Sequence, residues 1–193
     1  SVVSLLVNYD IKVFSCLGDL SSKVDVYKII ASANQHFGNI DVVINSAGIF
    51  PNVSLFESTD DMLEETFNIN YRSAFIFSRE FSKEMVANEW GRIVNIGSSS
   101  SYVGFKETTV YCSTKHALLG MSKAIHDELK QFNVRTLCIS PSSTQSQMGL
   151  ATKGQDYSTF LEPDDVAKYV VFAISFDSNI VSEEIFLKRM IIR

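Results

Sequence analysis

Short β-branched runs alternate with helix-like patterns along this chain, and this alternation limits its fold more than any other feature. The runs are apolar on both faces, which is typical of strands that are covered by helices on both sides. We therefore predict an α/β fold with one doubly wound parallel sheet and helices on both of its faces. The predicted strands are residues 12–17, 40–44, 92–96, 134–139 and 184–187, and the predicted helices are residues 23–37, 60–87, 109–132 and 164–176.

Length and composition fit one domain of this kind. The 193 residues are 46% hydrophobic and 20% charged, which is enough apolar material for a full core. The net charge of -5 and the absence of a basic stripe argue against nucleic acid as a partner. The sequence has no apolar run of about 18 residues and no signal peptide pattern, so we expect no membrane attachment.

The cysteines and histidines argue against a disulfide framework and a metal site. Cys16, Cys112 and Cys138 are odd in number, far apart and without CxxC spacing. The three histidines show no metal-ligand spacing either. Free thiols suit a reducing compartment, so we expect a cytoplasmic protein without a metal.

Small and polar residues follow several of the predicted strands. They are Asp19 and Leu20, residues 45–49, residues 97–100 and residues 141–146. In a parallel sheet, ligands bind beyond the carboxyl ends of the strands, so these stretches should share one rim. Such residues also make ordinary turns, which is the better explanation for each stretch alone. Four in succession favour a groove for a flat polar ligand such as a nucleotide.

A possible proton-transfer group lies between the strand at 92–96 and the helix at 109–132. Tyr111 and Lys115 are four residues apart on a helix, so they share one face. A nearby ammonium favours the phenolate and would lower the pKa of the tyrosine. Ser98 could donate a hydrogen bond to a substrate carbonyl. Alone, the pair could equally be a surface pair on an amphipathic helix.

Together these features resemble the short-chain dehydrogenase/reductase family, and within it the 3-oxoacyl-[acyl-carrier-protein] reductase-like branch. The resemblance covers essentially the whole chain and implies a Rossmann-like fold. The matching features stand in the family's order, with Ser98 thirteen residues before Tyr111. They are Asp19-Leu20, NSAG at 45–48, Asn70 in FNIN, GRIVNIGS ending at Ser98, YCSTK with Tyr111 and Lys115, and Pro141 after a strand.

The resemblance implies a catalytic role for four residues. Tyr111 would protonate the substrate oxygen during reduction, or remove the proton during oxidation. Lys115 would hold the nicotinamide ribose and lower the pKa of Tyr111, and Ser98 would orient the carbonyl. Asn70 resembles the asparagine that positions a water beside the lysine, although it could simply be a polar residue tolerated on a largely buried helix.

The resemblance also implies NADP or NAD as the cofactor, with NADP slightly favoured. Gly48 has a direct physical reason, because a missing Cβ lets a ligand approach the main chain. Ser142 departs from the family, which usually has glycine after the proline, and Ser146 stands where threonine is common. The implied cofactor positions are Asp19, Leu20, Asn45, Ala47, Gly48, Tyr111, Lys115, Pro141, Ser142 and Ser146.

Residues 147–160 match a mobile substrate lid, with Tyr157 and Phe160 as apolar substrate contacts, or form an ordinary surface loop. We also expect a homodimer or homotetramer formed through the two long helices, whose apolar residues exceed one face; a core role would explain them equally. These residues are Phe67, Phe75, Phe77, Phe81, Leu118, Leu119 and Met121.

The family's glycine-rich phosphate loop has no counterpart in this sequence. The resemblance therefore implies a single partial Rossmann domain, 1–193, that lacks the first strand, first helix and second strand. Residues 1–10 have the pattern of the end of a helix. In the family's strand order the strand at 12–17 would have lost its neighbours. We expect this chain to bind a dinucleotide poorly, and calorimetry with NADH and NADPH tests this.

Two other functional classes remain open at this stage. A nucleotide-sugar epimerase or dehydratase uses the same Tyr-x-x-x-Lys pattern, but such enzymes usually have a larger C-terminal substrate domain. A non-catalytic regulatory protein could keep the fold without turnover, although all four implied catalytic positions are filled here. The expected substrate is a small carbonyl, alcohol or acyl thioester.

Overall fold

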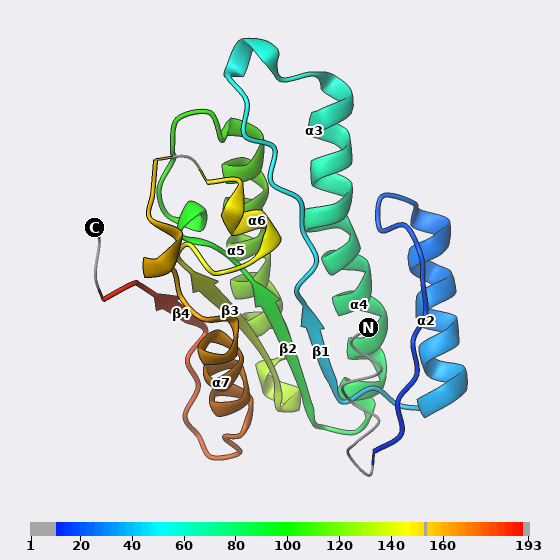
Figure 1. Ribbon diagram of the computed structural model, residues 1–193. Coiled ribbons are helices and arrows are strands. Elements are labelled where there is room, and N and C mark those ends of the chain that lie inside the picture. The colour runs from blue at the N-terminus through cyan, green and yellow to red at the C-terminus, as the bar shows by residue number, and fades with distance from the viewer. Residues whose placement is uncertain (1–10, 153, 191–193) are drawn as a thin grey trace.

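The chain forms an α/β structure built on one parallel sheet. The computed structural model describes residues 11–152 and 154–190 (Figure 1). Its four strands are ordered β1-β2-β3-β4, and all neighbouring pairs are parallel. The predicted fold class is therefore confirmed. The strands are β1 (Val42–Asn45), β2 (Gly91–Ile96), β3 (Val134–Pro141) and β4 (Glu184–Leu187).

The helices agree with the predicted ones to within a few residues. Ser22 caps the first described helix by accepting a hydrogen bond from the Asp25 N–H, and Pro163 begins the last one. The helices are α2 (Lys23–Phe37), α3 (Asp60–Phe67), α4 (Ser73–Ala87), α5 (Thr109–Leu129), α6 (Gln147–Leu150) and α7 (Pro163–Ile174). Within the described residues, none of these helices has the length and apolar character needed to cross a membrane.

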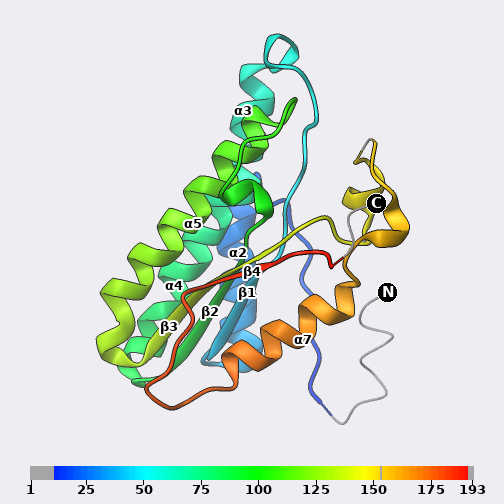
Figure 2. The ribbon, with the colours of Figure 1, turned by 90° about the vertical axis from the view of Figure 1, so that its left-hand side faces the viewer.

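Figure 2 shows that α2, α4 and α5 cover one face of the sheet, whereas α7 covers the other. Because successive strand side chains point to opposite faces, neighbours on β2 enter different cores. Ile93 packs with residues of α2 and α4, whereas Val94 packs with Val170 of α7. A third cluster joins α4 to α5 through Ala74, Leu118 and Met121.

A π-helical turn divides the long helix that the sequence predicts at 60–87. This turn spans Asn68–Arg72, between α3 and α4. π turns insert an extra residue into a helix and are frequent at functional sites. Here the turn contains Asn70, which is buried. The irregular turn therefore falls at one of the predicted site residues.

The predicted strand at residues 12–17 does not form. This segment is extended and runs beside the C-terminal end of α2, where Lys12 Nζ donates to His36 O and the Phe14 ring stacks on His36. A strand needs a neighbour for its backbone N–H and C=O groups, and the segment does not pair with the sheet. Local β propensity is therefore overruled by the lack of a partner. The helix end predicted at 1–10 lies outside the described residues.

Two arginines on β2 and β3 fix the loop that follows α7. Arg92 is fully buried and donates to Phe176 O and Asp177 Oδ1. Arg135 donates to the carbonyl oxygens of Phe176, Ile180 and Ser178. These bonds lie at the amino ends of the strands, so they leave the opposite edge of the sheet to the polar residues that the sequence singles out.

Candidate active site

The carboxyl ends of β1, β2 and β3 bring three of the four predicted stretches to one edge. Asn45 ends β1, Gly97 follows β2 and Pro141 ends β3. Gly97 lies in a crowded place, because a Cβ there would approach Ser140 Oγ to 2.3 Å and Cys138 Sγ to 2.9 Å. A side chain at 97 would therefore displace the start of the Ser98 segment.

Ser98 and Tyr111 meet at this edge. Ser98 begins a short 3-10 turn, Ser99–Ser101, and its hydroxyl accepts a hydrogen bond from the Ser100 N–H at 3.1 Å. Tyr111 lies in the first turn of α5, is 6% exposed, and its side chain is hydrogen bonded to that of Ser98. The Phe50 ring packs edge-on against Tyr111, with 4.7 Å between centroids. The sequence therefore identified two groups that are in contact.

Burial raises the pKa of Tyr111, and the hydrogen bond with Ser98 opposes this only in part. The direction is opposite to the one that the Tyr/Lys spacing predicts. Lys115 Nζ lies 5.7 Å from the centre of the Tyr111 ring and donates to Ile96 O at 2.7 Å. Because the ammonium is turned toward a backbone carbonyl, desolvation decides the pKa of the phenol.

Lys115 is itself a buried lysine, 5% exposed, on the same side of α5 as Tyr111. Burial lowers its pKa to about 8, and the nearby Cys138 thiol acts in the opposite direction. A lysine with a pKa close to neutrality can lose or hold a proton under ordinary conditions. This makes Lys115 the most strongly perturbed basic group at the edge of the sheet.

We expect Lys115 to make the protein more stable as the pH rises from 8 to 10.5. In this window the unfolded lysine, with an ordinary pKa of 10.5, holds a proton that the folded one, with a pKa of about 8, has lost. The free energy of unfolding should then rise by about 1.4 kcal/mol per pH unit. Below pH 8 both states are protonated and this slope disappears.

Urea unfolding at several pH values tests this expectation. Lys115→Met should remove the extra slope, because methionine fills similar space and binds no proton. Lys106→Met, at an exposed lysine, serves as the control and should leave the slope unchanged. An identical pH dependence in wild type and Lys115→Met would show that burial does not perturb Lys115.

Asn70 holds the loop that follows β1. Its Oδ1 accepts from the Ile49 N–H at 2.8 Å, and its Nδ2 donates to Ile49 O at 2.9 Å. The same Nδ2 is 3.2 Å from Thr114 Oγ1, next to Lys115. Asn70 thus joins the π turn, the loop after β1 and α5. It is not merely a polar residue that the helix tolerates.

Gly48 lies against these residues. A Cβ at Gly48 would be 3.2 Å from Asn70 Oδ1 and 3.9 Å from Lys115 Nζ. A side chain at this position would therefore crowd the two polar groups. The close backbone approach that the sequence predicts at Gly48 fits this arrangement.

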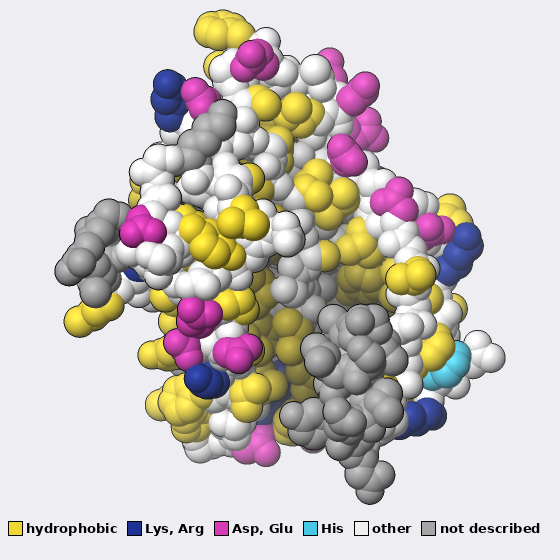
Figure 3. Space-filling view, viewed as in Figure 1, with side chains coloured by type: hydrophobic (Ala, Val, Ile, Leu, Met, Phe, Trp, Pro, Cys, Tyr) yellow, Lys and Arg dark blue, Asp and Glu magenta, His cyan; other side chains and the backbone are white. Residues whose placement is uncertain are grey.

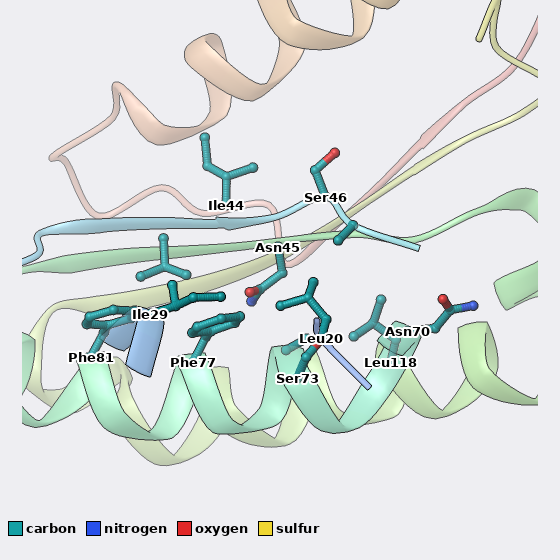
Figure 4. A pocket seen from close by; sticks show the side chains of 13 residues that line it. Leu20, Ile29, Ile44, Asn45, Ser46, Asn70, Ser73, Phe77, Phe81 and Leu118 are labelled. Atoms are coloured by element: carbon teal, nitrogen blue, oxygen red, sulfur yellow. The ribbon is translucent and has the colours of Figure 1, made fainter. Parts of the chain in front are cut away.

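Leu20, Asn45 and Ala47 line a cavity of about 310 Å³ that also reaches Asn70. In Figure 4, Asn45 points to the face of the sheet that α4 covers, whereas Ile44 and Ser46 point to the opposite face. Phe77 and Phe81 of α4 are among the apolar residues of its wall. Figure 3 shows hydrophobic side chains in the recess between α2 and the sheet.

Asp19 lies on the segment before α2 rather than at the end of a strand. Its Oδ1 accepts from both the N–H and the hydroxyl of Ser21, at 2.8 Å each. Arg72 Nη2 donates to Ser21 O at 2.5 Å. The π turn that contains Asn70 therefore also fixes the segment that carries Asp19 and Leu20.

The predicted contacts after β3 already have local partners. Ser142 Oγ accepts from the Arg189 N–H at 3.2 Å, and Ser146 caps α6 by accepting from the Gly149 N–H at 3.0 Å. In the predicted lid, Phe160 is buried and its ring centre lies 5.3 Å from that of the half-buried Tyr157. Phe160 thus anchors the end of this segment, and its role as a substrate lid stays a prediction.

One buried residue was missed by the sequence reasoning. Asn95 accepts from Asn45 Nδ2 at 2.8 Å and donates to Ser122 Oγ at 2.9 Å. These bonds tie β1, β2 and α5 together beneath the site. The signal was an asparagine inside the otherwise apolar run of β2, where a buried amide needs partners.

The site residues fit the nicotinamide and ribose end of a dinucleotide. Lys115 has three N–H donors, and within the described residues its hydrogen bond goes to Ile96 O. Gly48 leaves the space beside that ammonium free of a side chain. The same is not true of the dinucleotide phosphates, because the sequence has no glycine-rich loop to bind them.

Comparison with known proteins gives one consistent result. The family model described as short chain dehydrogenase matches residues 1–156. An NAD-dependent glycerol dehydrogenase of Listeria innocua is 26% identical over 180 residues, covering 86% of this chain and 69% of that protein. The chain spans between 52% and 69% of the length of three curated relatives.

Solved structures agree with this result. A 4-hydroxyisoleucine dehydrogenase complexed with NADH has a TM-score of 0.79 and 27% identity, covering 89% of this chain and 78% of that one. A putative betaketoacyl-ACP reductase has a TM-score of 0.76 and 26% identity, covering 89% and 74%.

Proposed function

Since the chain belongs to the short chain dehydrogenase family, we propose that the protein is an NAD- or NADP-dependent oxidoreductase that interconverts an alcohol and a carbonyl. The observation that carries this proposal is the contact of Ser98 with Tyr111 beside the buried ammonium of Lys115. A phenol, a hydroxyl and an ammonium at the carboxyl edge of a parallel sheet are suited to moving a proton to or from a carbonyl oxygen.

Tyr111 is the proposed acid of the reduction. Burial keeps its phenol protonated near neutral pH, so its O–H can donate a proton to the substrate oxygen. The Ser98 hydroxyl orients the same oxygen, and Lys115 binds the ribose hydroxyls of the cofactor. Asn70 holds the Ile49 backbone and so fixes the floor of the site. A bound nicotinamide dinucleotide supplies or accepts the hydride.

The cofactor's remaining contacts are proposed for the rest of the edge. Asp19 and Leu20 border the adenine, and Asn45, Ala47 and Gly48 border the dinucleotide backbone. Pro141, Ser142 and Ser146 lie beside the carboxamide, where backbone groups serve better than the hydroxyls of Ser142 and Ser146 that already have partners. NAD is supported by the two dehydrogenases whose names state NAD or NADH, and NADP by the reductase-like sequence resemblance.

We also propose that strands carrying a phosphate-binding loop pair with β1 in the complete protein. Within the described residues β1 pairs only with β2, so its other edge is open. Ile44 on this strand is 49% exposed, and the apolar cavity lies along it. Buried parallel sheets rarely expose such an edge.

A hydride-transfer assay on the complete protein tests the function. Glycerol and 4-hydroxyisoleucine with NAD or NADP, and acetoacetyl-CoA with NADH or NADPH, cover the substrate classes of the similar proteins and of the sequence resemblance. Oxidation or reduction of the cofactor that depends on one of these compounds supports the proposal. Cofactor binding without turnover of any carbonyl or alcohol would favour a non-catalytic role.

We also propose that the protein is cytoplasmic and that it forms a dimer through its two long helices. Of the seven apolar residues on the two long helices, Phe81, Leu118, Leu119 and Met121 are buried in this subunit and Phe67 and Phe77 are half-buried. Phe75 of α4 and Leu63 of α3 are exposed, at 38% and 42%, and support a contact between subunits. Light scattering that detects monomer alone would argue against it.

A further inference from the structure

Arg189 connects three segments at the carboxyl edge of the sheet. It lies two residues beyond β4, whose Leu187 is paired with Pro141 at the end of β3. Figures 1 and 2 show the red end of β4 beside the orange segment that precedes α7. Arg189 is thus close to the residues that leave β3 next to the proposed active site.

The guanidinium of Arg189 holds residues 155–160 through several contacts. Nη1 donates to Thr159 Oγ1 at 3.0 Å, and Nη2 donates to Gln155 Oε1 at 2.6 Å. The same guanidinium lies 4.9 Å from the centre of the Phe160 ring, which is buried. A planar guanidinium can make two hydrogen bonds and stack at once, which a flexible ammonium does less well.

The backbone of Arg189 is anchored to the end of β3. Its N–H donates to Ser142 Oγ at 3.2 Å, and Ser142 N donates to Leu187 O at 2.8 Å. Ser143 Oγ donates to the same Gln155 Oε1 at 3.2 Å. A glycine at 142 would have no acceptor for Arg189, so the serine that departs from the family pattern has a specific use here.

We propose that Arg189 is a positioning residue that holds residues 155–160 against the carboxyl edge of the sheet, with Ser142 as its anchor. This inference rests on the proposed function, because that edge is where an alcohol or carbonyl substrate would bind. Residues 155–160 then form a pre-ordered wall of the substrate site. Their position depends on a residue near the end of the described chain.

Hydrogen exchange on the 193-residue chain tests this without any substrate. In Arg189→Met, backbone amides of residues 155–161 should exchange about tenfold faster, because the hydrogen bonds that hold the segment are lost. Arg189→Lys should restore part of the protection, since lysine can still donate to one acceptor. Ser142→Gly should cause a smaller increase in the same peptide.

Arg135→Met is the matched control. The guanidinium of Arg135 likewise fixes a loop, by donating to the backbone carbonyl oxygens of Phe176, Ser178 and Ile180. The Arg135→Met substitution should therefore speed exchange in residues 176–181 and leave the exchange of residues 155–161 unchanged. Unchanged exchange of 155–161 in Arg189→Met, or equal acceleration over the whole chain, would overturn the proposal.

Kinetics separate this inference from the proposed function. If the protein oxidises glycerol, Arg189→Met should raise the KM for glycerol about tenfold and change the KM for the cofactor less than twofold. Lack of turnover of every assayed alcohol and carbonyl by the complete protein would refute the proposed function, while the exchange result would still decide the role of Arg189. An unchanged KM for glycerol together with unchanged exchange would show that Arg189 does not position the substrate site.

Discussion

Replacing Tyr111 with phenylalanine is expected to lower the rate of hydride transfer about 10³-fold, the usual contribution of a positioned general acid or base. The change removes one oxygen and keeps the ring that packs edge-on against Phe50. The fold should therefore remain intact. Without the phenol, neither Ser98 nor Lys115 can deliver a proton in the same position to the substrate oxygen.

The experiment compares kcat and the unfolding temperature of wild type, Tyr111→Phe and Tyr102→Phe. Tyr102 is also partly buried, stacks on Phe186 and has its pKa raised by burial, so it controls for loss of a buried hydroxyl. Tyr102→Phe should retain most of the activity. A Tyr111→Phe variant with more than about one tenth of the wild-type rate would refute the assigned acid.

The pH dependence of the same reaction follows from the raised pKa of Tyr111. Oxidation of an alcohol needs the phenolate, so its rate should increase as the pH rises toward the elevated pKa of Tyr111. Reduction needs the protonated phenol and should decline over the same range. Tyr111→Phe should lose both dependences.

The sequence predicted most of this architecture because the deciding interactions are local or periodic. The helix at Lys23–Phe37 and the strand at Glu184–Leu187 have the bounds that their patterns predict. The association of Ser98 with Tyr111 was also expected, from the order and spacing that resemble the family, and the two side chains do meet. The direction of a pKa shift was harder to predict. The pKa of Tyr111 was expected to fall next to Lys115, whereas burial raises it.

What the sequence did not reveal depends on partners far along the chain. Residues 12–17 have a strand-like composition, but a strand forms only where another strand can pair with it. Arg189 has no sequence signature, and its role becomes visible only when β4 brings it to Ser142. The sequence pattern did not show the π turn at Asn68–Arg72, because the hydrogen bonds that favour it join Asn70 to Ile49, 21 residues earlier in the chain.

Replacing Asn70 with leucine should lower the free energy of unfolding by about 3 kcal/mol, since two backbone groups of Ile49 lose their partner. Leucine has the same branched arrangement of four side-chain heavy atoms but can neither donate nor accept. Asn68→Leu changes the same kind of side chain in the same π turn and should cost much less. Denaturant unfolding of both variants gives the comparison.

The same substitution separates a structural role of Asn70 from a role in the chemistry. The contact of Nδ2 with Thr114 Oγ1 joins the loop after β1 to the helix that carries Tyr111 and Lys115. If Asn70 fixes that geometry, Asn70→Leu should reduce kcat about a hundredfold under conditions where it remains folded. Asn70→Asp keeps an acceptor for the Ile49 N–H but turns an oxygen toward Ile49 O, so it should be no better than leucine. Near-normal turnover in a folded Asn70→Leu would show that the loop keeps its place without this amide, and that the π turn serves packing alone.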